Sequence, residues 1–456
     1  MTRKYEILAI GNAIADVLGH VPETFLTDLA LEKGAMRLVD AEASAALLAA
    51  METHSTTRLQ TAAGGSAANT AACIGLLGGR AAYIGKVADD ALGAFFRESM
   101  EAASVDFYCS APHDSVPTAT CVAAVTPDGE RTMSTHLGAC RELGPDDVDE
   151  RLVLSAELVF LEGYLLDSPS SSAALLKACE VARSVGIPVA ISLSDGNCVR
   201  RHLPVLRHLV EKNLINVILA NDREIAALFE VASAEEAFPI ILRELFQTCV
   251  VTLGGDGAAI VEGFGDELDH DPAIHVARVP AGRVEKIVDL VGAGDSFAAG
   301  YLLGYVRWGD DMRAAALGAA CAANVISGSG ARPAKPFLQD AEIAWRIAPT
   351  PRTTPSAVAT LLAFDEAAKR YVKAHKESDA RDHEAWSAVI DQSGAIAALN
   401  DDHLTAYMAA FRLYARGLEN PLYPNWQDHQ TMCVIARRTA FKHHLADSLP
   451  QNFTFY

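Results

Sequence analysis

The chain of 456 residues is long enough for two or three folding units, or for one large α/β domain with an addition. Half of its residues are hydrophobic and about a fifth are charged, as in ordinary globular proteins. The formal net charge of −20 argues against a general nucleic-acid binder.

Cysteine usage and the N-terminus bear on the compartment. Nine cysteines are scattered without a Cys-x-x-Cys pair, which predicts reduced thiols and no structural zinc site of the usual kind. The first apolar run is too short for a signal peptide, and Asp16 interrupts it. No stretch approaches the length of a membrane span. We therefore expect a cytoplasmic protein without a membrane partner.

From Tyr5 to about Arg332, compact apolar strands alternate with amphipathic helices. The clearest helices are expected over 170–186, with Gly186 at its C-terminal end, and over 222–232. Strand–helix alternation predicts a three-layer α/β/α domain with a mostly parallel sheet. The expected strands cover residues 5–11, 81–87, 157–163, 188–194, 216–221 and 249–255.

Two stretches depart from that alternation. Residues 118–139 alternate with period two around a Pro-Asp-Gly turn, which predicts an antiparallel hairpin. A second β-rich piece runs from Val17 to Asp40. We expect segments of about 17–40 and 105–140 to form a small β lid over one end of the sheet. Substrates of such sheets bind at the carboxyl ends of the strands, so the lid would enclose them.

The composition of the sequence changes after Phe337. Residues 348–358 hold three prolines and three threonines, which is typical of a linker or of a loop before a helix. Apolar stripes at helical spacing follow, which predict helices. We therefore divide the chain into a domain over 1–348 and a helical C-terminal extension over 349–456. For the extension, docking against the domain and formation of a homo-oligomer both stay open.

The run DLVGAGDSFAAG, from Asp289 to Gly300, places glycines and an acid where an apolar segment gives way to a helix. The first N–H groups of a helix lack partners, and the helix dipole adds positive charge there. Gly292, Ala293 and Gly294 could therefore cradle a phosphate. The carboxylate of Asp295 either caps the helix or acts as a general base toward a hydroxyl that attacks the phosphorus.

This run lacks the Gly-Lys-Ser/Thr of a Walker A loop and the glycine spacing of a dinucleotide fingerprint. It resembles the C-terminal signature of the PfkB (ribokinase-like) carbohydrate and nucleoside kinases, D-T-x-G-A-G-D. Residues 62–71, AAGGSAANTA, resemble the N-terminal signature of the same family. The resemblance covers roughly 5–333, and it implies a ribokinase-like fold with Asp295 as the base.

The resemblance extends to a sugar site. The stretch GNAIADV resembles the adenosine kinase branch, in which the aspartate equivalent to Asp16 binds the ribose hydroxyls, with Asn12 beside it. A carboxylate that accepts from two vicinal hydroxyls suits that task. Gly64, Gly65 and Asn69 would line the same site. The alternative interpretations are a turn aspartate after a strand and a helix N-cap.

Arg131 lies on the second arm of the expected hairpin. Nucleoside kinases of the family keep an arginine in a similar stretch that reaches the transferring phosphoryl group, and the guanidinium geometry suits phosphate. The alternative is a surface arginine. The usual small polar residues of the C-terminal signature are replaced by Leu290 and Val291, which puts potassium activation in doubt.

The resemblance also implies a nucleotide site. Asn221 and Glu224 match an N-x-x-E element, in which Glu224 would hold Mg²⁺ through water and Asn221 would lie beside ATP. Gly255 and Gly257 would lie near the phosphates or ribose of ATP. Asn324 would be the polar contact on the adenine side.

These residues together predict an ATP- and Mg²⁺-dependent kinase that phosphorylates the 5′-hydroxyl of a nucleoside, adenosine first, and releases the monophosphate and ADP. A sugar kinase for ribose or another small sugar is the first alternative. A nucleoside-sensing module without catalysis is the second, although the intact Asp295 argues against it. The expected partners are small molecules, not nucleic acid.

Overall fold

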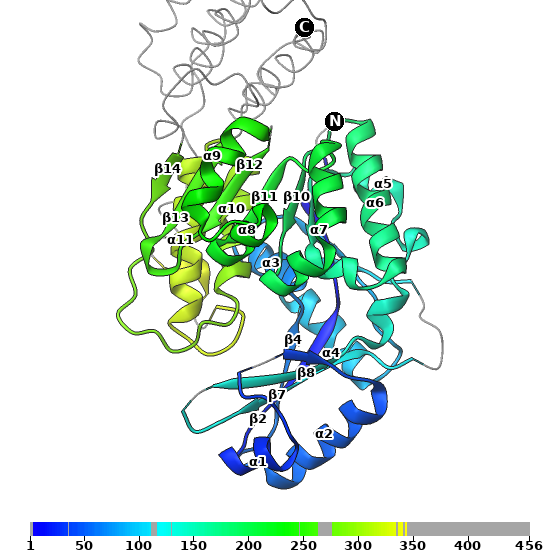
Figure 1. Cartoon of the computed structure of the whole chain (residues 1–456). Coiled ribbons are helices and arrows are strands. Elements are labelled where there is room, and N and C mark those ends of the chain that lie inside the picture. The colour runs from blue at the N-terminus through cyan, green and yellow to red at the C-terminus, as the bar shows by residue number, and fades with distance from the viewer. Residues whose placement is uncertain are drawn as a thin grey trace, which may run out of the picture. The chain divides into compact units, whose positions relative to one another are not determined.

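The computed structural model describes residues 3–34, 36–110, 116–128, 130–245, 247–262, 276–333, 336–340 and 343 (Figure 1). The predicted boundary at 348 and the extension over 349–456 lie outside the described residues, so that division stays a prediction.

The main sheet has nine strands in the order β14-β13-β12-β11-β10-β9-β1-β5-β6. The pairs from β6 to β12 are parallel, and β13 and β14 add an antiparallel edge. All six expected strands are confirmed. The bounds are β1 (Tyr5–Ile10), β5 (Ala81–Ile84), β6 (Val105–Tyr108), β9 (Ala156–Glu162), β10 (Val189–Ser192), β11 (Val217–Asn221), β12 (Thr248–Thr252), β13 (Ala258–Glu262) and β14 (Val276–Val279).

Helices cover both faces of this sheet, as the alternation predicts. Every residue of β1 is buried, which is typical of a central parallel strand. Leu8 and Ile10 join a buried cluster with Leu175 of α6 (Pro169–Ser184). The alternate residues face the other side, where α3 (Ser66–Leu76) contacts β1. The three-layer α/β/α fold is therefore confirmed.

The helices expected over 170–186 and 222–232 and after the glycine run are confirmed as α6, α8 and α10. Gly186, at a φ of 70°, lies just past the end of α6 as predicted. The bounds are α1 (Glu23–Asp28), α2 (Ala41–His54), α4 (Ala91–Ala102), α5 (Glu150–Leu154), α7 (Gly196–Glu211), α8 (Asp222–Phe229), α9 (Ala234–Glu244), α10 (Ala293–Trp308) and α11 (Asp311–Ile326). Among the described residues, no helix is both long and apolar enough to cross a membrane.

A second sheet of five strands, in the order β3-β8-β7-β2-β4, forms the lid. It follows β1 directly in the chain and lies below the main sheet in Figure 1. The expected hairpin is confirmed, because β7 and β8 pair antiparallel. The bounds are β2 (Ile14–His20), β3 (Met36–Leu38), β4 (Gln60–Gly64), β7 (Ala119–Val125) and β8 (Arg131–His136).

The predicted lid boundaries of 17–40 and 105–140 need correction. Val105–Tyr108 is β6 of the main sheet, since it follows α4 and pairs parallel with β5. The lid instead gains β4, whose small residues show no clear alternation of apolar and polar side chains. Helix α1 interrupts the expected β-rich piece.

The packing of α3 against α4 generates a test of the fold. Within α3, a Cβ on Gly75 would lie 2.0 Å from the carbonyl oxygen of Ala103. Alanine is ordinarily the better helix residue by about 0.5–1 kcal/mol. We nevertheless expect Gly75→Ala to lower the free energy of unfolding by about 1–3 kcal/mol in urea titrations, because the backbone must move.

The control is Gly196→Ala at the start of α7, where the nearest atom would lie 3.7 Å from the new Cβ. Its stability should stay within about 0.5 kcal/mol of the wild type. A Gly75→Ala protein as stable as the control would contradict this packing.

Candidate active site

The turn before α10 has the conformation that the glycine run predicts. Gly292 has a φ of 75°, and a Cβ there would lie 2.3 Å from the carbonyl oxygen of Ala331. Gly294 is exposed, with open space where a side chain would be. The N–H of Ala293 donates to the carbonyl of Leu290 at 3.3 Å. The open part of the expected cradle is therefore at Gly294.

Asp295 lies in the first turn of α10 and is held by side chains of α3. Ser66 Oγ donates to Oδ1 at 2.7 Å, and Asn69 Nδ2 donates to Oδ2 at 3.0 Å. Burial raises the pKa of Asp295 to about 6, although these two hydrogen bonds and Arg332 pull it down. Because α10 begins at Ala293, Asp295 is not its N-cap residue. The carboxylate of Asp295 on α10 accepts both of these hydrogen bonds from a second helix, α3. Capping of α10 alone does not account for these contacts.

Helix α3 is itself fixed by Glu162 at the end of β9, a residue that sequence reasoning missed. Its Oε1 accepts from the N–H of Asn12 at 2.8 Å, and its Oε2 accepts from the N–H of Ala67 at 2.7 Å. Gly65 precedes the helix at a φ of 94°, where a Cβ would lie 2.1 Å from the Asn12 carbonyl oxygen. Asn12 and Gly65 thus lie against each other at the start of the helix that carries Asn69, and their role in a sugar site stays a prediction.

Asp16 enters the same region from the lid. Gly64, on the neighbouring strand β4, leaves room for it, because a Cβ there would lie 2.4 Å from Asp16 Oδ2. Burial raises the pKa of Asp16 to about 7, Arg131 and Arg332 lower it, and Asp295 raises it. The carboxylates from the lid and from α10 therefore act on each other electrostatically.

Arg131 begins β8, on the hairpin arm where it was expected. Its Nη2 donates to the carboxylate of Asp289, an oxygen of which also accepts the N–H of Gly330 at 2.8 Å. The second oxygen of Asp289 accepts the N–H of Val291 at 3.1 Å. The lid is thereby tied to the turn that precedes α10. Contact of Arg131 with a phosphoryl group stays a prediction, and potassium activation stays in doubt as before.

On the nucleotide side, Asn221 and Glu224 form a reciprocal helix cap on α8. Glu224 Oε1 accepts from Asn221 Nδ2 at 2.6 Å, Glu224 Oε2 accepts from the Asn221 N–H at 3.0 Å, and Asn221 Oδ1 accepts from the Glu224 N–H at 2.9 Å. Burial raises the pKa of Glu224 to about 7. The N-x-x-E spacing is thus explained by capping alone, and the magnesium role stays a prediction.

The other expected ATP contacts differ in their surroundings. Gly255 is exposed and has open space beside it. Gly257 is buried at a φ of 89°, and a Cβ there would lie 2.0 Å from the carbonyl oxygen of Val279, so the turn itself requires glycine. Asn324 of α11 donates to Asp340 at 3.2 Å, and its buried Oδ1 has no partner among the described residues.

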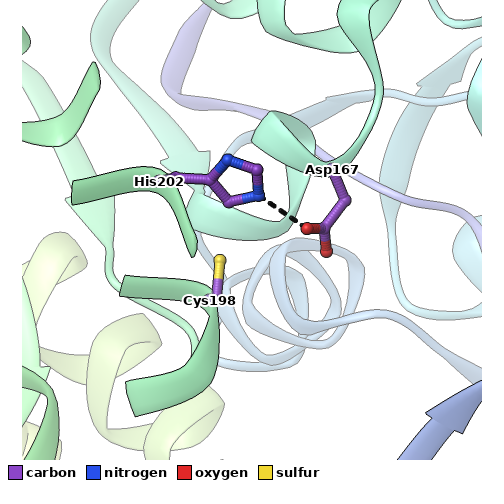
Figure 2. Close-up of side chains that lie close together, drawn as sticks. All are labelled: Asp167, Cys198 and His202. Carbon is purple, nitrogen blue, oxygen red and sulfur yellow. Dashed lines mark hydrogen bonds and ion pairs between the residues drawn. The ribbon is translucent and has the colours of Figure 1, made fainter. Parts of the chain in front are cut away.

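Two polar clusters lie outside this site. Asp167, Cys198 and His202 place their ligand atoms within 4.8 Å of one another (Figure 2). The Asp167 carboxylate, however, accepts from His202 at 2.7 Å and from Arg201 at 2.9 and 3.0 Å. A guanidinium already neutralises this carboxylate, so an ion-pair network accounts for the cluster.

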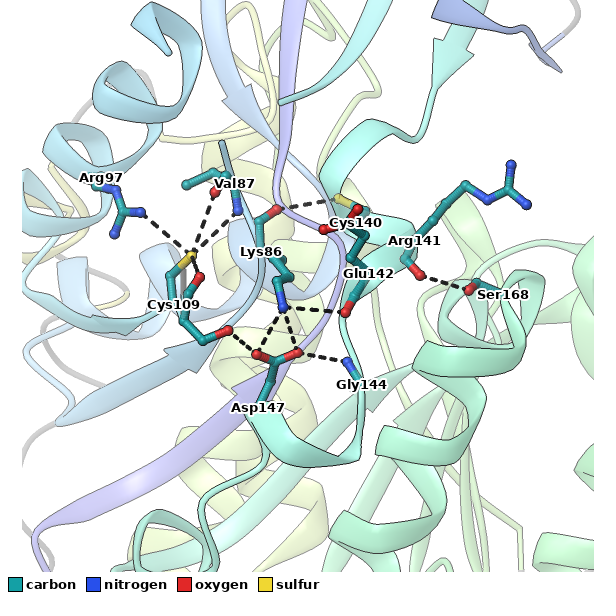
Figure 3. A network of polar contacts seen from close by, with 11 residues as sticks. Lys86, Val87, Arg97, Cys109, Cys140, Arg141, Glu142, Gly144, Asp147 and Ser168 are labelled. Atoms are coloured by element: carbon teal, nitrogen blue, oxygen red, sulfur yellow. Dashed lines mark hydrogen bonds and ion pairs between the residues drawn. The ribbon is translucent and has the colours of Figure 1, made fainter. Parts of the chain in front are cut away.

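The second cluster is a buried ion pair. Lys86 Nζ lies 3.1 Å from both carboxylate oxygens of Asp147, which also accepts the N–H of Gly144 at 2.7 Å (Figure 3). These contacts fix the segment between β8 and β9 to the loop after β5, a structural role.

The comparisons with known proteins decide the family. The model of the pfkB family of carbohydrate kinases matches residues 34–338. The chain belongs to this family. As a pfkB family kinase it is a phosphotransferase with an alcohol group as acceptor, and its relatives act on sugars or nucleosides.

Three relatives illustrate the range of the family. The chain is 32% identical over 272 residues to the ATP-dependent ribose-1-phosphate kinase of Halopiger xanaduensis, covering 59% of this chain and 82% of that one. A probable sugar kinase from Rhizobium etli has a TM-score of 0.68 and 35% identity, covering 76% and 100%. The adenosine kinase from Sinorhizobium meliloti has a TM-score of 0.67 and 38% identity, covering 75% and 99%.

Glu162 provides a test of the site's architecture. We expect Glu162→Gln to destabilise the protein, because an amide N–H₂ must face one of two backbone N–H donors. Burial raises the pKa of Glu162 from 4.5 to about 7. The folded wild type thus keeps a proton that the unfolded chain releases, and it loses stability as the pH rises through this window. Glutamine does not titrate, so the cost of the substitution should be largest near pH 5 and shrink toward pH 8, by on the order of 2 kcal/mol.

Urea titrations at several pH values measure this cost. Glu157→Gln is the control on the same strand, because Glu157 pairs with the half-exposed Arg80 and should contribute less than about 1 kcal/mol. A cost of Glu162→Gln that grows with pH would contradict the assignment.

Proposed function

We propose that this pfkB family kinase transfers the γ-phosphoryl group of ATP to the 5′-hydroxyl of a nucleoside, with adenosine as the preferred substrate. The observation that carries the proposal is the position of Asp295. Its carboxylate is held by Ser66 and Asn69 at the N-terminus of α10, beside the exposed Gly294 and within electrostatic reach of Asp16. The groups proposed as base, anion-binding helix end and sugar-binding acid would thus act at one place.

Asp295 would accept the proton of the attacking hydroxyl. With a pKa of about 6 it is mostly ionised at neutral pH, and it is a stronger base than an ordinary aspartate. The hydrogen bonds from Ser66 and Asn69 orient the carboxylate, which favours a single attack geometry. The N–H groups at the start of α10 would bind the transferring phosphoryl group together with Arg131, once its guanidinium leaves Asp289.

ATP would bind along Asn221, the exposed Gly255, Gly257 and Asn324. Both carboxylate oxygens of Glu224 take part in the helix cap, so their remaining lone pairs fit Mg²⁺ through water molecules and not by direct ligation. Bound Mg²⁺ would neutralise phosphate charge.

A cytoplasmic location and small-molecule partners are further parts of the proposal. The eight described cysteines are free thiols, in line with a reducing compartment.

The choice of acceptor needs observations beyond the base, since a ribose ring is common to nucleosides and sugars. Adenosine is supported by Asp16, whose carboxylate can accept from two vicinal hydroxyls, and by the 38% identity to an adenosine kinase. A sugar kinase is the second candidate, supported by the 32% identity to a ribose-1-phosphate kinase. A sensor without catalysis would not need the base that Asp295 supplies.

Replacement of the base tests the proposed chemistry. We expect Asp295→Asn to lower kcat for formation of AMP from adenosine by about 10²- to 10⁴-fold, because an amide cannot accept the proton. The dissociation constant of adenosine, measured calorimetrically, should change by less than about tenfold. The control is Asp146→Asn, an exposed aspartate outside the site. Unchanged turnover by Asp295→Asn would refute the mechanism.

The sugar-binding role of Asp16 has a separate test. We expect the wild type to prefer adenosine over 2′-deoxyadenosine in kcat/KM, and Asp16→Ala to remove most of that preference. A hydrogen bond to a charged group contributes about 1.5–3 kcal/mol, so the loss should be roughly 10- to 150-fold. His20→Ala, an exposed residue on the same strand, is the control. A preference that survives in Asp16→Ala would exclude this role.

A further inference from the structure

Residues 330–332 form a short strap across the base of the candidate active site. The N–H of Gly330 donates to Asp289 at 2.8 Å. The backbone of Ala331 fills the space where Gly292 would carry a Cβ, with its carbonyl oxygen 2.3 Å from that position. The strap is therefore packed against the turn that leads into α10, and its position influences the shape of that turn.

Arg332 anchors the strap to α4. Its Nη1 donates to Ser99 Oγ at 2.7 Å, and its Nη2 lies 3.7 Å from the sulfur of Met100. The Nε atom is fully buried and has no hydrogen-bond partner among the described residues. A buried N–H without a hydrogen-bond partner costs stability, so its presence in the folded protein asks for an explanation.

The charge of Arg332 acts electrostatically on two carboxylates of the site. It lowers the pKa of both Asp16 and Asp295, while burial lowers the pKa of Arg332 itself. Arg131 is the other cation that faces Asp16, and it is already paired with Asp289.

The remaining groups around Asp295 come from three other elements. Glu162 of β9 and Cys73 of α3 both interact with its charge, and Asp16 of β2 repels it. Ser66 and Asn69 are neutral donors. Among these groups, Arg332 is the cation that acts on Asp295.

We propose that Arg332 is a positioning residue for phosphoryl transfer: anchored on Ser99, it fixes the strap against Gly292 and supplies positive charge that favours the ionised forms of Asp16 and Asp295. Two carboxylates that share a buried site repel each other, and one of them retains a proton unless a cation compensates. A protonated Asp295 could not act as a base. The inference rests on the proposed function for its catalytic consequence, but not for its electrostatic content.

Three variants separate charge from anchoring. Arg332→Gln removes the charge, Arg332→Lys keeps it with altered geometry, and Ser99→Ala removes the anchor while the guanidinium stays. Activity is measured as the pH dependence of kcat/KM with adenosine and ATP. We expect the acid limb of the kcat/KM profile of Arg332→Gln to move toward higher pH by about one pH unit. In Arg332→Lys and Ser99→Ala the limb should stay at the wild-type position, with kcat reduced.

A second readout does not need turnover. Loss of the cation raises the carboxyl pKa values in the folded protein, so the folded state binds more protons than the unfolded state over a wider range. Stability then falls more steeply as the pH rises. We expect the difference in Tm between the wild type and Arg332→Gln to widen from pH 6 to pH 8, and the difference for Ser99→Ala to stay constant.

The outcomes are distinguishable. An unshifted acid limb and a constant Tm difference in Arg332→Gln would overturn the proposal. An acid limb that shifts in Arg332→Lys as much as in Arg332→Gln would also overturn it. If Arg332→Gln does not fold, a shifted acid limb in Arg332→Lys still decides against the proposal. A wild type that phosphorylates no nucleoside or sugar would instead refute the proposed function, while the Tm series would still test Arg332.

Discussion

The pair of hydrogen bonds from α3 to the Asp295 carboxylate is the contact on which the site depends. Both carboxylate oxygens accept hydrogen bonds from this one helix, through Ser66 and Asn69. The start of the helix is fixed in turn by Glu162, which binds the N–H groups of Asn12 and Ala67 from the end of β9. The position of the Asp295 carboxylate relative to the central strands is thus fixed in two steps, first by α3 and then by Glu162. Such indirect support is what holds a reactive group to one geometry.

Burial of several acids in one place sets the electrostatics of the site. Asp16, Glu162 and Asp295 each have a pKa raised by burial, and Asp295 raises the pKa of the other two. Arg131 and Arg332 act in the opposite direction, from the lid and from the strap. The balance leaves Asp295 basic enough to accept a proton near neutral pH and still mostly ionised. The lid contributes to this balance, because Asp16 and Arg131 lie on lid strands.

The sequence was sufficient to predict six of the parallel strands, the hairpin and the glycine turn, because apolar runs and left-handed glycines are local signals. It was not sufficient for β4, whose lid pairing depends on residues distant in the chain. The same holds for Glu162 and Arg332: a lone acid after a strand and a lone arginine in a loop carry no spacing signal, and only folding brings them to Asp295. The Asn221 and Glu224 pattern shows the converse, since a helix cap explains it without a ligand.

The identity of the phosphorylated product tests the central claim most directly. The full chain is incubated with ATP, Mg²⁺ and an equimolar mixture of adenosine, ribose and ribose 1-phosphate, and the products are identified by mass and ³¹P NMR. The account predicts adenosine 5′-monophosphate as the dominant product, with the phosphate on the primary hydroxyl. A dominant sugar phosphate, or an absence of any phosphorylated product, would contradict it.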